Sequence, residues 1–266
     1  MSAQAEVAVI GGSGFYAFLE DTEQVPVSTP YGPPSAPVTI GVVGDRRVAF
    51  LPRHGVAHEF PPHRVNYRAN LWALDRLGVR RIIGPCAVGS LKPAIAPGEF
   101  MVLDQLVDRT WGRPDTYADG PIVNHVSFAD PYCADLSRLV TAAAHDLGGL
   151  TVHDGGTVVV IQGPRFSTRA ESNWFRAAGW DVVNMTQHPE AYLARELGMC
   201  YCGLALVTDY DTGLEGVDGI EPVTAEQVFA TLDANIARTR ELLFAALPMV
   251  DPPGSACRCR SARVVS

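Results

Sequence analysis

Hydrophobic positions follow two different periods along the chain, and their succession predicts a mixed α/β fold. Short, continuously apolar runs at 7–10 and 199–208 predict buried strands. Apolar residues at helical spacing, often followed by glycine, predict helices between such runs. These helices are expected over 65–77, 136–147, 168–178, 189–197 and 224–247. Strands that alternate with helices and are apolar throughout indicate a largely parallel sheet covered on both faces.

The remaining strands complete one domain. They are expected over 38–43, 47–51, 80–83, 100–107, 156–161 and 182–183, and the first two flank a Gly44-Asp45 turn as a hairpin. We interpret 86–90 as a small-residue loop after the strand that ends at Ile83. The chain has no repeat and no low-complexity segment. We therefore predict a single α/β domain over 1–250, with a mixed, largely parallel central sheet flanked by helices, and a flexible tail over 251–266.

Composition and charge narrow the function classes. The 266 residues are 47% hydrophobic and 19% charged, which suits one large folded domain. A net charge of -8 argues against a nucleic-acid partner, because such proteins usually present a basic face. No apolar run approaches the roughly 20 residues that span a bilayer, so no membrane partner is expected. A cytoplasmic location is the default expectation.

The six cysteines do not form a recognisable ligand pattern. Cys200 and Cys202 fall in a predicted buried strand and are interpreted as small core residues. Cys257 and Cys259 lie in the polar tail, where a redox or metal role is possible but a flexible tail is favoured. No His/Cys/Asp spacing resembles a ligand set, so no metal is predicted.

Two short motifs carry the most chemistry. Asn184-Met185-Thr186 offers an amide, a thioether and a hydroxyl, which suit a sugar and an anion. Asp209 and Asp211 follow an apolar run and point to the same side if the strand continues. A carboxylate accepts hydrogen bonds from an amino group, and it can donate a proton once protonated. A purine leaving group requires both; the alternative interpretation is a solvated turn or a helix N-cap.

Four further elements follow predicted strands and could converge on one anion. Ser13 lies in a glycine-rich turn, Arg53-His54 offers a guanidinium fork and an imidazole, Cys86-Ala87 opens the small-residue loop, and Thr186 adds a hydroxyl. Carboxyl ends of strands in open α/β sheets are where ligands bind. Each element has a plain alternative as an ordinary turn or surface loop.

Six motifs then match a known family in the order in which they occur. They are Gly11-Gly12-Ser13-Gly14, Arg53-His54-Gly55, Ala87-Val88-Gly89-Ser90, residues 163–172, Asn184-Met185-Thr186 with Pro189-Glu190, and Thr208-Asp209-Tyr210-Asp211. They resemble the trimeric purine nucleoside phosphorylases, in particular the 5′-deoxy-5′-methylthioadenosine phosphorylase branch. The match runs from about Val7 to about Leu247.

The resemblance implies a nucleoside phosphorylase-like fold and a phosphorolysis, in which phosphate attacks C1′ of a nucleoside and the purine leaves. Inorganic phosphate is then a co-substrate, and no other cofactor is expected. By resemblance, phosphate is held by Ser13, Arg53, His54, Cys86, Ala87 and Thr186. The nucleoside is bound by Asn184, by Met185 under the ribose, by Phe166 and Ser167 at the base, and by Asp211. Asp209 also contacts the purine and is the expected catalytic acid.

The resemblance also implies a homotrimer with its sites at subunit interfaces. Ala225 and Val228 of the last helix fall at positions that line the 5′ pocket, and His125 falls in the loop contributed by a neighbouring subunit. Asp209 favours 6-aminopurine nucleosides, whereas asparagine at this position would suit 6-oxopurines. Cys86 departs from the branch, which usually has threonine there, and His188 is expected at the surface.

Other functions remain open from the sequence. A purine nucleoside or methylthioinosine phosphorylase would act on 6-oxopurines, a hydrolase would use water, and a binding protein would not turn its nucleoside over.

Overall fold

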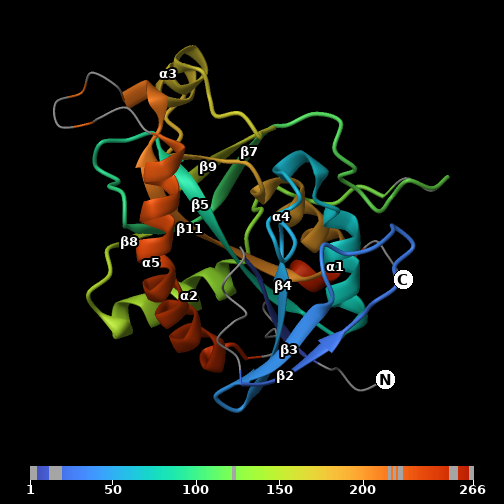
Figure 1. Ribbon diagram of the computed structural model, residues 1–266. Helices are drawn as coiled ribbons and strands as arrows, with labels where there is room; N and C mark the ends of the chain where they lie inside the picture. Colours follow the sequence, from blue (N-terminus) through green and yellow to red (C-terminus); the bar gives the residue numbers. More distant parts are fainter. Residues whose placement is uncertain are drawn as a thin grey trace.

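The computed structural model describes residues 5–11, 20–121, 124–214, 217, 220, 224–251 and 257–263. One sheet lies between helices, with α2 and α5 on one side and α1 and α4 on the other (Figure 1). The strands are β1 (Val7–Gly11), β2 (Glu20–Val25), β3 (Val38–Val43), β4 (Arg46–Pro52), β5 (Arg81–Ser90), β6 (Phe100–Val102), β7 (Gln105–Arg109), β8 (Val152–Asp154), β9 (Thr157–Ile161), β10 (Val182–Asn184) and β11 (Cys200–Tyr210). The α-helices are α1 (Tyr67–Arg76), α2 (Ala134–Leu147), α3 (Arg169–Ala177), α4 (Gln187–Glu196) and α5 (Ala225–Ala246). Short 3-10 turns are η1 (Pro62–Arg64), η2 (Thr212–Leu214), η3 (Leu247–Met249) and η4 (Cys259–Ala262).

The sheet topology is mixed and largely parallel. The described strands form an 11-stranded sheet in the order β2-β3-β4-β1-β5-β10-β9-β7, and β11 joins it by pairing with β5 and β6. The pairs β1–β4, β1–β5, β5–β11, β6–β8, β7–β9 and β9–β10 are parallel. The predicted fold class is therefore confirmed. The predicted hairpin is also present, as the antiparallel pair β3–β4.

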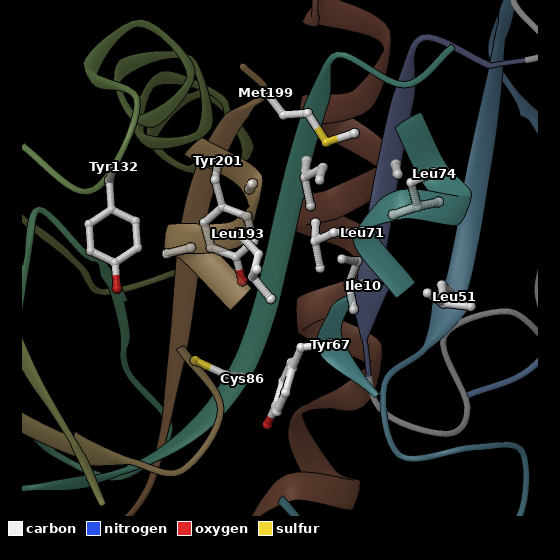
Figure 2. Close-up of a cluster of buried hydrophobic side chains, with 14 of the residues drawn as sticks. Ile10, Leu51, Tyr67, Leu71, Leu74, Cys86, Tyr132, Leu193, Met199 and Tyr201 are labelled. Atoms are coloured by element: carbon white, nitrogen blue, oxygen red, sulfur yellow. The ribbon is translucent and has the colours of Figure 1, made fainter. Parts of the chain in front are cut away.

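Each face of the sheet has its own hydrophobic core. On the α1 and α4 side, Leu71, Leu74 and Leu193 pack on strand residues such as Ile10 (Figure 2). In that view Cys86 and Tyr67 lie at one end of the cluster, and Met199 lies at the other. A second core joins α2 and α5 to the opposite face. Strands buried on both faces explain the continuous apolar runs in the sequence.

Local hydrogen bonds define where two helices begin. Thr168 Oγ1 accepts from the Glu171 N–H at 3.2 Å, and the Glu171 carboxylate accepts from the Thr168 N–H at 2.7 Å. This reciprocal capping box satisfies two donors that would otherwise lack a partner at the start of α3. Asn66 caps α1 by accepting from the Ala69 N–H.

The interpretation of 86–90 as a loop is wrong, because β5 continues to Ser90. Its small residues serve close approach. A Cβ on Gly84 would meet the Tyr201 hydroxyl, and a Cβ on Gly89 would lie 3.1 Å from Asp209 Oδ2. Glycine is therefore needed at these positions of the strand, because side chains of the neighbouring strand β11 approach its backbone too closely for a larger residue.

The predicted strand over 100–107 is two strands, since the chain changes partners at Leu103 and Asp104. The Leu103 N–H donates to Gly203, whereas the Asp104 N–H donates to Gly156. Consequently β6 pairs with β11 and β8, and β7 pairs with β9. The strands β2 and β8 were not predicted, and both are edge segments of mostly polar sequence.

The described part of the C-terminal segment, 257–263, packs against the domain, where the sequence predicted a flexible tail. Cys259 is 5% exposed. The Arg263 guanidinium donates to both Asp75 oxygens at 2.8 Å and also to the Leu197 carbonyl at 2.7 Å. Among the described residues, no helix has the length and apolar character that crossing a membrane requires.

Candidate active site

A cavity of about 460 Å³ opens where β4, β5, β10 and β11 end, beside α5. Its volume lies in the range of small-molecule sites. The expected site residues that line it are Arg53, His54, Cys86, Ala87, Phe166, Ser167, Asn184, Met185, Thr186, Asp209 and Asp211. Residues spread over more than 150 positions of the chain thus share one cavity.

Four expected residues are not among this lining. His125 is exposed and borders a different cavity, beside the C-terminal segment. Ser13 and the side chains of Ala225 and Val228 lie outside the described residues. From α5, Ile236 and Thr239 line the cavity instead.

The cavity has two polar ends, separated along β5. Arg53 donates to the Pro85 carbonyl at 3.1 Å, and Asp209 lies beside Gly89 as its register partner. At about 3.3 Å per residue, the four steps from Pro85 to Gly89 span about 13 Å. We call the part around Arg53, His54 and Thr186 the Arg53 end, and the part around Asp209, Asp211 and Ser167 the Asp209 end.

At the Arg53 end, the guanidinium is already held by the protein. Arg53 is 2% exposed and forms a bidentate ion pair with Glu190, with both N–O distances 2.7 Å. It also donates to the carbonyls of Ile10 and Pro85. Burial acts to lower the pKa of Arg53, but the Glu190 carboxylate raises it and prevails. Of the five guanidinium N–H groups, these bonds to described residues leave one on Nη1 for a ligand.

His54 offers the cavity a hydrogen-bond acceptor. Burial and the Arg53 charge lower the pKa of His54 to about 4, so the ring is neutral near pH 7. Its Nδ1 lies 2.8 Å from the Phe60 carbonyl, which can only accept, so Nδ1 carries the proton. Nε2 is then left with a lone pair. An imidazole in this state suits a phosphate that carries a proton.

Asn184 braces the cavity wall with hydrogen bonds inside the protein. Its Nδ2 donates to the Ala87 carbonyl at 2.9 Å, and its Oδ1 accepts from the N–H groups of Thr186 and Gln187 at 2.6 and 2.8 Å. The side chain therefore ties β5 to the start of α4. It fixes the position of the Thr186 hydroxyl, which lies 3.3 Å from the same oxygen.

Cys86 is a protonated thiol in this environment. Burial raises its pKa to about 12, which excludes a thiolate near neutral pH. Gln187 Nε2 donates to its sulfur at 3.3 Å. Gln187 itself is fully buried, so the pair belongs to the wall between β5 and α4.

At the Asp209 end, a β-bulge directs the catalytic candidate into the cavity. β11 and β5 are in register up to Val207 and Val88, and the next pair is Asp209 with Gly89, so Thr208 is the extra residue. Thr208 Oγ1 donates to Asp209 Oδ1 at 2.7 Å. Burial, with the nearby Asp211 charge, raises the pKa of Asp209 to about 6, although the Thr208 hydrogen bond opposes the rise.

Asp211 and Ser167 present polar atoms that the described residues leave without a hydrogen-bond partner. Asp211 Oδ2 and Ser167 Oγ are both buried and lack one among those residues. Burial raises the pKa of Asp211, against the effect of the Ser172 hydroxyl and the Thr212 N–H and of the Ser167 hydroxyl, which lies near Asp211 but outside hydrogen-bond geometry. Buried polar groups are nearly always paired in folded proteins, so these atoms indicate a ligand position.

Phe166 and Met185 supply apolar surface to the cavity. Phe166 is 48% exposed at the cavity, which is unusual for an aromatic residue and suits a flat ring as its partner. Met185 sits against Gly163, where a Cβ would lie 2.6 Å from its sulfur.

Sequence reasoning missed several residues that build the site. The buried Glu190 was noted only as part of a motif, without its partner. Arg113 donates to the carbonyls of Met185, His188 and Gln162, and so fixes the loop that carries Met185. Only its arginine identity, in an otherwise ordinary loop, hinted at this role. His188, expected at the surface, is 8% exposed and lies 3.4 Å from Asp108.

The α/β sheet thus carries one cavity with a cation at one end and carboxyl groups at the other. The family model described as "Phosphorylase superfamily" matches residues 6–248. The chain belongs to that family.

Similar proteins cover nearly the whole chain. An S-methyl-5′-thioadenosine phosphorylase of Mycolicibacterium smegmatis is 58% identical over 95% of this chain and 94% of its own length. A purine nucleoside phosphorylase of Streptomyces coelicolor is 54% identical over 97% and 94%. The crystal structure of methylthioadenosine phosphorylase from Schistosoma mansoni in complex with adenine superposes with a TM-score of 0.86 at 38% identity, covering 92% of this chain and 91% of that one.

Proposed function

We propose that this enzyme cleaves 5′-deoxy-5′-methylthioadenosine with inorganic phosphate, giving adenine and 5-methylthioribose-1-phosphate. Relatives between 47% and 58% identical bear the name of this activity. Inorganic phosphate is the co-substrate, and the reaction needs no further cofactor. A cytoplasmic location, where nucleosides and phosphate occur together, is part of the proposal.

The observation that carries the proposal is the Asp209 end of the cavity. Adenine offers an amino group and ring nitrogens at its edge. Asp211 Oδ2 and Ser167 Oγ are buried without partners among the described residues, and a base edge would supply them. Asp209, with its pKa raised to about 6, can hold a proton close to neutral pH. An acceptor and an acid side by side match an aminopurine that leaves with a proton.

Phosphate binds at the Arg53 end in this proposal. The remaining Arg53 N–H and the Thr186 hydroxyl donate to its oxygens, and the His54 Nε2 lone pair accepts from a protonated oxygen. The Glu190 carboxylate neutralises much of the Arg53 charge. The protein therefore orients this anion more than it neutralises its charge. A bound anion would raise the pKa of His54.

The two ends act on opposite charges as the bond breaks. Positive charge develops on the ribose at C1′, where the neighbouring phosphate stabilises it, while negative charge develops on the purine. Transfer of the Asp209 proton to the purine nitrogen neutralises the second charge. Groups placed beforehand at developing charges are usually the largest catalytic contribution, and proton transfer adds about 10²–10⁴-fold.

The test is base release from methylthioadenosine, adenosine and inosine, each with and without phosphate. We expect phosphate-dependent release that is fastest with methylthioadenosine. Release without phosphate would identify a hydrolase, and binding without release would identify a nucleoside-binding protein.

A second candidate function is a purine nucleoside phosphorylase that acts on 6-oxopurines, since one relative at 54% identity bears that name. Asp209 argues against it, because a carboxyl group accepts a hydrogen bond from a 6-amino group, whereas asparagine at this position suits a 6-oxo group. A kcat/KM for inosine equal to that for methylthioadenosine would favour this second candidate.

We further propose a homotrimer in which each site includes a neighbouring chain. His125 borders a cavity other than the one with the Asp209 and Arg53 ends, and in this proposal it serves the site of a neighbouring copy. Exposed Val56 and Trp111, 55% and 64% accessible, provide apolar surface for such an interface. Sedimentation should give a trimer; an active monomer would contradict the proposal.

A further inference from the structure

Four cysteine thiols from three separate segments of the chain lie close together. Cys133 is the N-cap residue of α2, Cys200 is the first residue of β11, and Cys257 and Cys259 belong to the C-terminal segment. All four sulfurs lie within 4.8 Å of one another. Cys257 Sγ lies 3.8 Å from Cys133 Sγ and 3.3 Å from Cys200 Sγ. The sequence, judged by spacing alone, suggested no such ligand set.

These separations fit a tetrahedral metal centre. Zinc–thiolate bonds are about 2.3 Å long, and four sulfurs around one tetrahedral ion are then about 3.8 Å apart. The observed distances bracket this value, so the thiols would shift by less than about 1 Å to hold an ion. We propose that Cys133, Cys200, Cys257 and Cys259 bind one zinc ion as a structural site. This inference does not depend on the proposed function.

The surroundings favour a structural site over a catalytic one. Cys133, Cys200 and Cys259 are between 1% and 5% exposed and belong to the core on the α2 and α5 side. Four protein ligands complete a tetrahedron, and no position remains for water or substrate. The cluster also lies outside the cavity that holds Arg53 and Asp209.

Charge nearby suits the complex. One Zn²⁺ with four thiolates carries two negative charges, since binding replaces the four thiol protons, which go to solvent. Arg195 and Arg258 border the same region, as does Arg138, which is paired with Asp135. Cys133 also sits at the α2 N-terminus, where the helix dipole favours negative charge.

The site would fasten the C-terminal segment to the domain. Cys257 and Cys259 come from that segment, and the Arg263 fork on Asp75 holds its further part. The ion would add two thiolates of the folded domain to this attachment. Because such ligands come together only in the folded chain, the binding free energy of the ion adds to folding stability.

The experiment uses the full chain, expressed with zinc and purified under a thiol reductant. Metal content is measured by mass spectrometry, and thiols are counted by alkylation after denaturation with a chelator. We expect one zinc per chain and six alkylated cysteines. Replacing zinc with cobalt should give the thiolate-to-metal absorption of a tetrahedral sulfur site. Chelation should lower Tm.

Two variants separate the cluster from general effects. Cys257→Ser with Cys259→Ser should lose the zinc and the effect of chelator on Tm. Cys202→Ala is the matched control, because Cys202 is equally buried two residues from Cys200 but lies outside the cluster; it should keep one zinc. Absence of zinc overturns the proposal. Fewer than six alkylated thiols would then indicate disulfides, and six would indicate free thiols.

Discussion

The two ends of the active-site cavity differ in how their polar groups are satisfied. At the Arg53 end, Glu190 and two backbone carbonyls occupy most of the guanidinium. At the Asp209 end, Asp211 Oδ2 and Ser167 Oγ have no hydrogen-bond partner among the described residues. Most hydrogen bonds of the guanidinium are therefore made without a ligand, whereas two buried polar atoms of the Asp209 end have none.

This difference separates two ways of building a binding site. A cation that is paired within the protein has a fixed orientation and stabilises the fold. It costs little free energy when the ligand is absent. Buried carboxyl groups cost stability in the empty protein, because burial disfavours their charged form. The same cost favours a base that supplies the missing hydrogen bonds. Free energy is therefore stored at the Asp209 end, and the following variants test that distribution.

Asp209→Asn should have the largest effect. The amide cannot give up a proton to the purine, so kcat for methylthioadenosine should fall about 10²–10⁴-fold. Steady-state kinetics at saturating phosphate measure this loss. Near-normal turnover would exclude Asp209 as the proton donor.

Glu190→Gln should destabilise the fold by about 3–5 kcal/mol, because Arg53 would keep a buried charge without its partner. Urea denaturation measures the change. Glu171→Gln is the control: Glu171 forms a similar bidentate pair with Arg165 at the surface, and glutamine still fits the capping box. Equal losses in the two variants would show that the Arg53 end is not specially dependent on its ion pair.

Asp209→Asn should also stabilise the empty protein at pH 7, by about 3 kcal/mol. The sign follows from the raised pKa. Asp209 titrates at about 6 in the fold against an ordinary value of 3.8, so ionisation costs stability above pH 6, and that cost disappears as pH falls towards 3.8. Urea denaturation at pH 7 and pH 4 should show the gain only at pH 7. A variant less stable at both values would argue against stored free energy.

The smallest expected effect is on how steeply kcat/KM declines as pH rises. Asp209 is protonated below about pH 6, so kcat/KM should decline by at most about tenfold per unit as pH rises above that value. Asp209→Asn should lack this decline, whereas any contribution from phosphate titration remains in both proteins. A decline of equal slope in the variant would assign it to phosphate alone.

The sequence predicted the elements well where one local signal decided them. The apolar run of β1 and the helical spacing of α3 are examples, and both elements lie close to where they were expected. The prediction failed for β5, whose glycines suggested a loop. Their role depends on Tyr201 and Asp209, which approach from another strand. No local pattern contains that information.

The site was predicted as a set of residues, but their states were not. Motif order placed Arg53, His54 and Asp209 together. The sequence did not show that Glu190, 137 positions away, would occupy Arg53, or that burial would leave His54 neutral. It likewise separated Cys133 from Cys257 by 124 positions, which conceals their proximity. Such properties arise only when distant segments pack.

Thr208 has a consequence for how this family can change by insertion and deletion. Because side chains alternate along a strand, the presence of this one additional position decides which way Asp209 faces. Loss of the Thr208 codon would remove both the hydroxyl that donates to Asp209 and the bulge that offsets Asp209 from the register with β5. The position of the acid therefore depends on the number of residues in β11 as well as on the identity of its side chains.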